Sequence, residues 1–204
     1  MTSKRSFALP LILATALVLA TALGLLFSGA AGAQEDQYAA VRDKIEECTA
    51  CHGTNGASDN PEFPILAGQH YYYTYVQLKD FKTGLRANDI MEDIAKGLEK
   101  SEMKLIAQFF SEQKWPNIDH RPDDAIASAG RTAADSGQCV ACHLGDYTGN
   151  SRVPRISGQH PDYLKKTMFD FKRKHRKNSP AIATLLAAFS DEDIEAMAEF
   201  LAGF

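Results

Sequence analysis

The feature that most constrains this chain is a five-residue motif, Cys-x-x-Cys-His, that occurs twice. It reads Cys48-Thr-Ala-Cys51-His52 and Cys139-Val-Ala-Cys142-His143, and the two copies use all 4 cysteines of the 204 residues. In this motif the two thiols attach haem covalently and the histidine binds its iron. Disulfides or zinc sites would not need the histidine twice, and no further cysteine completes a zinc site. The sequence therefore predicts two covalently bound c-type haems, with His52 and His143 as proximal ligands.

The residues around the motifs also repeat. At an offset of 90, the first half shares with the second Pro64, Gly68, Gln69, His70, Tyr73, Asp80, Phe81, Lys82, Arg86 and Asn88, which match Pro154, Gly158, Gln159, His160, Tyr163, Asp170, Phe171, Lys172, Arg176 and Asn178. Such self-similarity indicates duplication of a structural unit. We predict one domain over residues 34–116, a polar, proline-containing linker over 117–124, and a second domain over 125–204.

Each half is predicted to be helical. A helix is expected to lead into and include each Cys-x-x-Cys-His motif, and another to follow each Gly-Gln pair, over about 69–83 and about 161–174. The last helix is the clearest, because Ser190 can cap it and Ile194, Met197, Ala198 and Leu201 form one apolar face. No segment shows the alternation of a strand. An all-α fold follows, in which a haem supplies the apolar surface that a domain of about 80 residues lacks.

The N-terminus resembles an export signal. Lys4 and Arg5 precede an apolar stretch over residues 7–27, and Ala31-Gly32-Ala33 suits signal peptidase, so residues 1–33 are predicted to be removed before Gln34. An uncleaved membrane anchor is the alternative. Without Lys4 and Arg5, 20 of the 22 basic residues remain against 26 acidic ones. We therefore expect a periplasmic protein that does not bind nucleic acid and has no other membrane span.

The chain resembles the dihaem cytochrome c4 family, which has two class I cytochrome c domains in tandem, each wrapped round one haem. It is also similar to the cytochrome subunit of flavocytochrome c sulfide dehydrogenases. The resemblance rests on the two haem motifs, on 53–56, 63–69 and 73–81, and on Gly84, Arg86, Asn88 and Met91. It implies that the carbonyls of Pro64 and Pro154 accept a hydrogen bond from the proximal histidines.

The family pattern Arg-x-Asn-x-x-Met implies Met91 as the second axial ligand of the first haem. Met103 is the competitor, but a structural role suits its place at the start of the final helix of that half. A His/Met pair raises the reduction potential and fills the coordination sphere of the iron, as electron transfer requires.

The second half departs from this pattern, because the residue that matches Met91 is Ala181. Met168 and Met197 are interpreted as core residues. The sixth ligand of the second iron is therefore assigned tentatively to His175. A five-coordinate, open iron and ligation by Lys174 or Lys177 remain alternatives.

Three further features have simpler interpretations. His70 and His160 are expected to lie on the polar surface. Some of Tyr71, Tyr72, Tyr73 and Tyr75 are expected to pack on haem or between the domains. The basic run over 172–177 is expected to be a solvated face that can also steer an acidic partner.

These observations favour an electron-transfer protein that is not itself an enzyme. By resemblance, a quinol-oxidising complex or a dehydrogenase would supply electrons and a terminal oxidase or reductase would accept them. One alternative is the electron-accepting subunit of a flavoprotein sulfide dehydrogenase. Another is an enzyme or ligand binder that acts at the second haem, which lacks its methionine.

Overall fold

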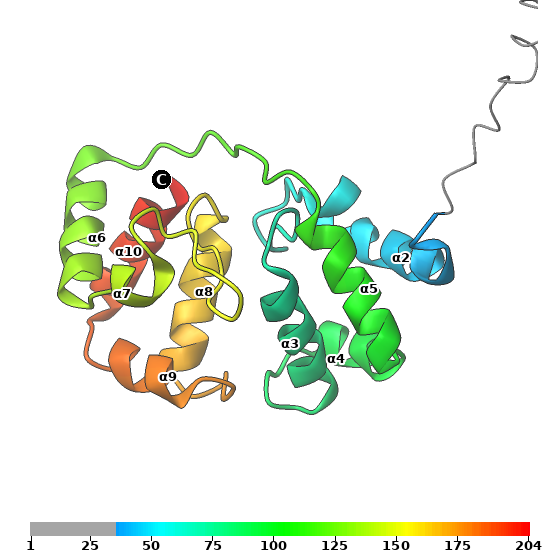
Figure 1. Ribbon diagram of the computed structural model, residues 1–204. Helices are drawn as coiled ribbons and strands as arrows, with labels where there is room; N and C mark the ends of the chain where they lie inside the picture. Colours follow the sequence, from blue (N-terminus) through cyan, green and yellow to red (C-terminus); the bar gives the residue numbers. More distant parts are fainter. Residues whose placement is uncertain (1–35) are drawn as a thin grey trace, which may run out of the picture. The chain divides into compact units, whose positions relative to one another are not determined.

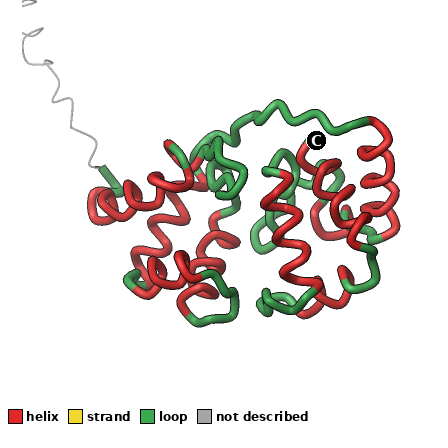
Figure 2. The backbone as a smooth tube through the Cα atoms, turned by 180° about the vertical axis from the view of Figure 1, so that it is seen from behind, coloured by secondary structure: helices red, strands yellow, loops and turns green. Residues whose placement is uncertain are grey.

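The computed structural model describes residues 36–204, in which every regular element is a helix (Figure 2). Two isolated bridge pairs are the only strand-like pairings in this range. The predicted export signal over 1–33 lies outside the described residues. None of the described helices is both long enough and apolar enough to cross a membrane.

The first half contains η1 (Ala39–Val41), α2 (Arg42–His52), η2 (Thr54–Gly56), α3 (Tyr71–Lys82), α4 (Asp89–Lys96) and α5 (Lys100–Ser111) (Figure 1). Its core joins Val41 and Ile45 to Leu78 of α3 and to Ile106 and Phe110 of α5. Helix α3 packs against both α4 and α5.

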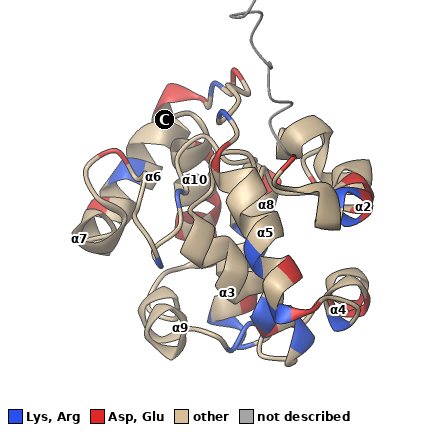
Figure 3. Cartoon of the chain, turned by 45° about the vertical axis from the view of Figure 1, so that its right-hand side comes forward, with Lys and Arg blue, Asp and Glu red and all other residues tan. Residues whose placement is uncertain are grey.

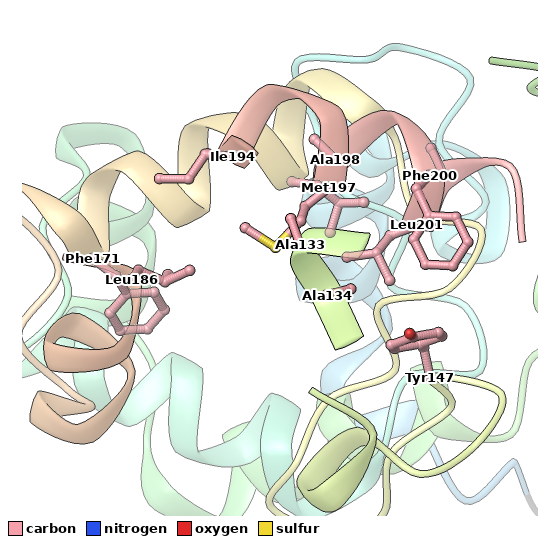
Figure 4. Packing of buried hydrophobic residues seen from close by; sticks show 12 residues of the cluster. Ala133, Ala134, Tyr147, Phe171, Leu186, Ile194, Met197, Ala198, Phe200 and Leu201 are labelled. Carbon is pink, nitrogen blue, oxygen red and sulfur yellow. The ribbon is translucent and has the colours of Figure 1, made fainter. Parts of the chain in front are cut away.

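The second half contains α6 (Asp124–Ser136), α7 (Val140–His143), α8 (Pro161–Lys172), α9 (Pro180–Leu186) and α10 (Asp191–Ala202). The helix predicted after Ser190 is confirmed, because the Ser190 hydroxyl accepts the Asp193 N–H and the Asp193 carboxylate accepts the Ser190 N–H. Its apolar face is buried as expected: Met197 and Leu201 pack with Ala133 and Ala134 of α6 (Figure 4).

Helices α6 and α10 cross closely at Gly130. A Cβ on this residue would lie 2.1 Å from the carbonyl oxygen of Ala196 and 2.7 Å from the Cβ of Phe200. Only a glycine allows the two backbones to approach this far. The absence of a side chain at Gly130 therefore sets the distance between the helices that frame the second haem motif.

The prediction of one helix leading through each haem motif holds in the first half and is wrong in the second. Helix α2 runs unbroken to His52, whereas α6 ends at Ser136 and the motif forms the separate turn α7. Between them Gln138 adopts a positive φ of 52°. A left-handed residue just after Gly137 ends a helix, so the chain changes direction before it reaches Cys139.

Candidate functional site

The first haem motif lies on α2. Cys48 and Cys51 are one helical turn apart, and all four cysteines of the two motifs are free thiols rather than disulfides. Burial raises the pKa of the Cys48 thiol to about 11. Cysteines that form no disulfide are available for the two thioether bonds that attach a haem.

Both predicted proximal histidines are held by a proline carbonyl. The Nδ1 of His52 lies 2.9 Å from the oxygen of Pro64, and the Nδ1 of His143 lies 2.9 Å from the oxygen of Pro154. A carbonyl only accepts, so Nδ1 carries the proton in each ring. The hydrogen bonds that the family resemblance implied are therefore present in both halves.

The same two rings are kept neutral. Burial lowers the pKa of His52 and of His143 below the ordinary value for histidine, and outweighs the opposing effect of the carbonyl hydrogen bonds. A neutral imidazole protonated at Nδ1 has its lone pair on Nε2. Each ring thus offers iron the nitrogen that it needs, in one orientation.

Met91 lies in the first turn of α4. The side-chain oxygen of Asn88 accepts the Met91 N–H at 2.9 Å and caps the helix at this point. The Met91 side chain is partly buried against the core of the first half, whereas Met103 is only 3% exposed, within that core. Met103 is therefore a core residue, and Met91 remains the predicted ligand.

The second half lacks both a methionine at the position that matches Met91 and the asparagine cap at the start of the helix. Asn178, which matches Asn88, donates its amide N–H groups to the side chains of Gln77 and Asp80 instead. Helix α9 begins at Pro180 without a side-chain cap, and Ala181 stands where Met91 does. The first turn of α9 therefore differs from that of α4 both in its cap and in the residue that matches Met91.

The structure places the three other candidate ligands at the surface. The side chain of His175 is 69% exposed, and its Nδ1 lies 3.9 Å from the carboxylate of Asp170. Lys174 and Lys177 are also exposed. The turn between α8 and α9 carries the predicted basic run, and Lys and Arg residues gather around it in Figure 3.

Two arginines meet where the halves join. Arg86 donates to Gln77 at 3.0 Å and to the Tyr163 hydroxyl at 2.7 Å, while Arg176 donates to Gln77 at 2.7 Å and to the Tyr73 hydroxyl at 3.1 Å. Their backbones form one of the two isolated bridges. Tyr73 therefore lies between the halves, as expected for some of the tyrosines.

This interface carries charges of both signs, because the Asp80 carboxylate, which accepts from Asn178, is buried in the same hydrogen-bond network as the two arginines. No ion pair within residues 37–204 involves Arg86 or Arg176. Burial alone would raise the pKa of Tyr163, but the two guanidiniums outweigh it and hold that pKa below its ordinary value. The unpaired cysteines and the neutral imidazoles of the two motifs fit two haems.

Two pairs of residues that connect the halves were missed from the sequence alone. The prediction that His160 lies on the surface is wrong: it is 6% exposed, and its Nε2 lies 2.9 Å from the oxygen of Ser58. His70 makes the matching contact with the oxygen of Thr148 at 2.8 Å. Gln69 and Gln159, which precede them, are buried as well. Their recurrence in both halves was the available signal, but it does not say which partner each side chain has.

Comparison with known proteins places this site in a family. Residues 39–115 match the model of the family described as "Cytochrome c", and residues 125–201 match that of "Cytochrome C oxidase, cbb3-type, subunit III". Cytochrome c4 of Pseudomonas aeruginosa is 31% identical over 198 residues, which cover 92% of this chain and 98% of that protein. The chain belongs to the cytochrome c4 family.

The crystal structure of reduced recombinant cytochrome c4 from Pseudomonas stutzeri agrees, with a TM-score of 0.73 and 31% identity over 80% of this chain and 96% of that one. A protein named thiosulfate dehydrogenase electron acceptor, from Stutzerimonas stutzeri, is 31% identical over 176 residues, 76% of this chain and 77% of that protein. The predicted all-α fold of two class I cytochrome c domains is thus confirmed. As a cytochrome c4 relative, the chain has two covalently bound haem c groups and transfers electrons to and from redox proteins.

Proposed function

We propose that this cytochrome c4 relative is a periplasmic carrier that relays single electrons from a respiratory or dehydrogenase donor to a terminal oxidase or reductase. Haem supplies the redox-active iron, and the protein sets its potential and its orientation. The observation that carries the proposal is the hydrogen bond from a histidine Nδ1 to a proline oxygen, which measures 2.9 Å in both halves. The two domains are also hydrogen-bonded to each other. The predicted export signal supports the location.

Each cysteine and histidine of the two motifs has a role in this proposal. Cys48 and Cys51 attach the first haem, and Cys139 and Cys142 attach the second. His52 and His143 are the proximal ligands, and their Nδ1–H groups are already engaged by proline carbonyls. Met91 is the sixth ligand of the first iron. A His/Met iron is six-coordinate in both oxidation states and has a raised potential, which suits electron transfer rather than ligand binding.

The second iron is proposed to have an exchangeable sixth position. Ala181 cannot coordinate, and the exposed side chain of His175 would have to leave Asp170 and turn inward to bind. His175 therefore remains the proposed protein ligand, in competition with small external ligands. This asymmetry would give the two haems different reduction potentials. Electrons would then pass preferentially toward the haem with the higher potential.

A second candidate is the role of electron acceptor for a dehydrogenase. The similarity to a thiosulfate dehydrogenase electron acceptor favours this candidate. Here the oxidation of a sulfur compound would occur on another chain, and this protein would remove the electrons one at a time.

Spectra of the purified holoprotein test the haem assignments. We expect one low-spin His/Met signal with the red-edge band of thioether-ligated ferric haem, and one signal of different type from the second haem. Two identical His/Met signals, or a single haem per chain, would contradict the proposal. Stopped-flow reduction by a thiosulfate dehydrogenase and by a quinol-oxidising complex separates the two functions, because the physiological donor should reduce the protein at least tenfold faster than the other.

A further inference from the structure

In each half, one buried glutamine forms hydrogen bonds with the proximal loop of the other half, which is the segment around Pro64 or Pro154 that contacts the proximal histidine. The side-chain oxygen of Gln159 accepts the N–H of Ile65 at 2.9 Å, and its amide nitrogen donates to the Ile65 carbonyl at 3.0 Å. In the same way, Gln69 accepts the N–H of Arg155 at 3.0 Å and donates to the Arg155 carbonyl at 2.9 Å. The two contacts are equivalents under the internal repeat.

The position of these contacts relative to the proximal histidines is what matters. The Ile65 N–H belongs to the same peptide group as the Pro64 carbonyl, which accepts the Nδ1–H of His52. Two hydrogen bonds are therefore in series, from His52 through one peptide group to Gln159. In the second half the series runs from His143 through the Pro154 peptide to Gln69.

Hydrogen bonds in series polarise one another. When Gln159 accepts from the Ile65 N–H, electron density shifts toward the Pro64 oxygen, which becomes a stronger acceptor for His52. A stronger acceptor at Nδ1–H makes an imidazole more basic and fixes its orientation, as outer-shell partners of metal-binding histidines do. A more basic imidazole stabilises ferric over ferrous iron and lowers the reduction potential.

We propose that Gln159 and Gln69 are positioning residues that tune the reduction potential of the haem in the opposite domain. This inference rests on the proposed ligation by His52 and His143. Both glutamines are at most 5% exposed, so water does not compete for the peptide. His70 and His160 also direct their backbone N–H to the glutamine oxygen, at 3.0 Å each, and hold it in place. Separation of the two domains would break both series and change both potentials.

The test is a redox titration of the full-length holoprotein and four variants, followed by optical and EPR spectra in which the two ferric haems give separate signals. Gln159→Leu removes the acceptor at similar volume, and should raise the potential of the first haem by a threefold to tenfold change in its equilibrium constant. This is about 30 to 59 mV, since tenfold is about 59 mV for one electron. The second haem should stay unchanged. Gln69→Leu should show the reverse pattern.

Two matched variants separate tuning from simple loosening of the interface. Gln159→Glu keeps an oxygen for the Ile65 N–H and should leave the first potential at or below the wild-type value. Arg152→Ala removes a contact between the halves, the 3.2 Å hydrogen bond to the Tyr72 hydroxyl, without touching either proline peptide, and should shift neither haem. If Gln159→Leu does not fold, Gln159→Asn withdraws the same oxygen by one methylene.

Equal shifts of both haems in each glutamine variant, or no shift in either, would overturn the inference. The proposed ligation fails separately, if wild-type spectra show that one of the haems lacks a proximal histidine. The two failures are therefore distinguishable.

Discussion

The close crossing of α6 and α10 at Gly130 can be tested by whether Gly130→Ala raises or lowers the free energy of unfolding. On a free helix surface, Gly→Ala stabilises by about 1 kcal/mol through helix propensity. Here the new Cβ would lie 2.1 Å from the Ala196 oxygen and 2.6 Å from its carbonyl carbon, both atoms of the α10 backbone. Backbone cannot rotate out of the way, so the helices must move apart. Overpacking of this kind costs about 1–3 kcal/mol or more.

Because the new Cβ would meet a backbone atom at 2.1 Å, we take the upper part of this range, about 2–3 kcal/mol. Net of the gain of about 1 kcal/mol in propensity, Gly130→Ala should be less stable than wild type by about 1–2 kcal/mol. If the described unit unfolds as one, this lowers the Tm by about 2–8 °C. The assay is thermal unfolding of the holoprotein by far-UV circular dichroism. Ser128→Ala is the control, because Ser128 is exposed on the same helix and should gain a few tenths of a kcal/mol. A Gly130→Ala protein as stable as wild type would refute the close crossing.

Three further predictions concern the haem sites. Met91→Ala should abolish the red-edge thioether band and lower the potential of the first haem, whereas Met103→Ala should keep the band and cost about 2–5 kcal/mol of stability, because Met103 is buried. His175→Ala should change the spin state or CO affinity of the second haem; identical EPR and CO-difference spectra would remove it as a ligand. Leu144 has φ 64° and ψ 172°, values close to those of Gly53 in the first half (74° and 167°). Leu144→Gly should relieve about 1–3 kcal/mol of strain, and a net gain of about 1 kcal/mol in chemical denaturation is expected after the entropy cost of glycine; a loss of stability would contradict this.

Covalent chemistry and local helix signals could be predicted from the sequence. The two Cys-x-x-Cys-His motifs predict the haems because the spacing of thiols and histidine is itself the attachment site. Ser190 and the apolar face ending at Leu201 predicted α10, since caps and periodicity act within a few residues. Ala181 in place of Met91 could be found by aligning one half with the other. All these signals are local or come from the repeat.

The tertiary structure decided what depends on contacts between distant residues. The side chain of Gln159 finds Ile65 94 residues away, and His160 finds Ser58 102 residues away, so no local pattern could assign them. A polar residue can be buried at no great cost where its hydrogen bonds are satisfied, which is why the surface prediction for His160 was wrong. The sequence by itself determined that there are two covalently bound haems, and it predicts the cysteines and histidines that hold them. The fold decided that each proximal loop is completed by the other domain, because only docking brings those peptides together.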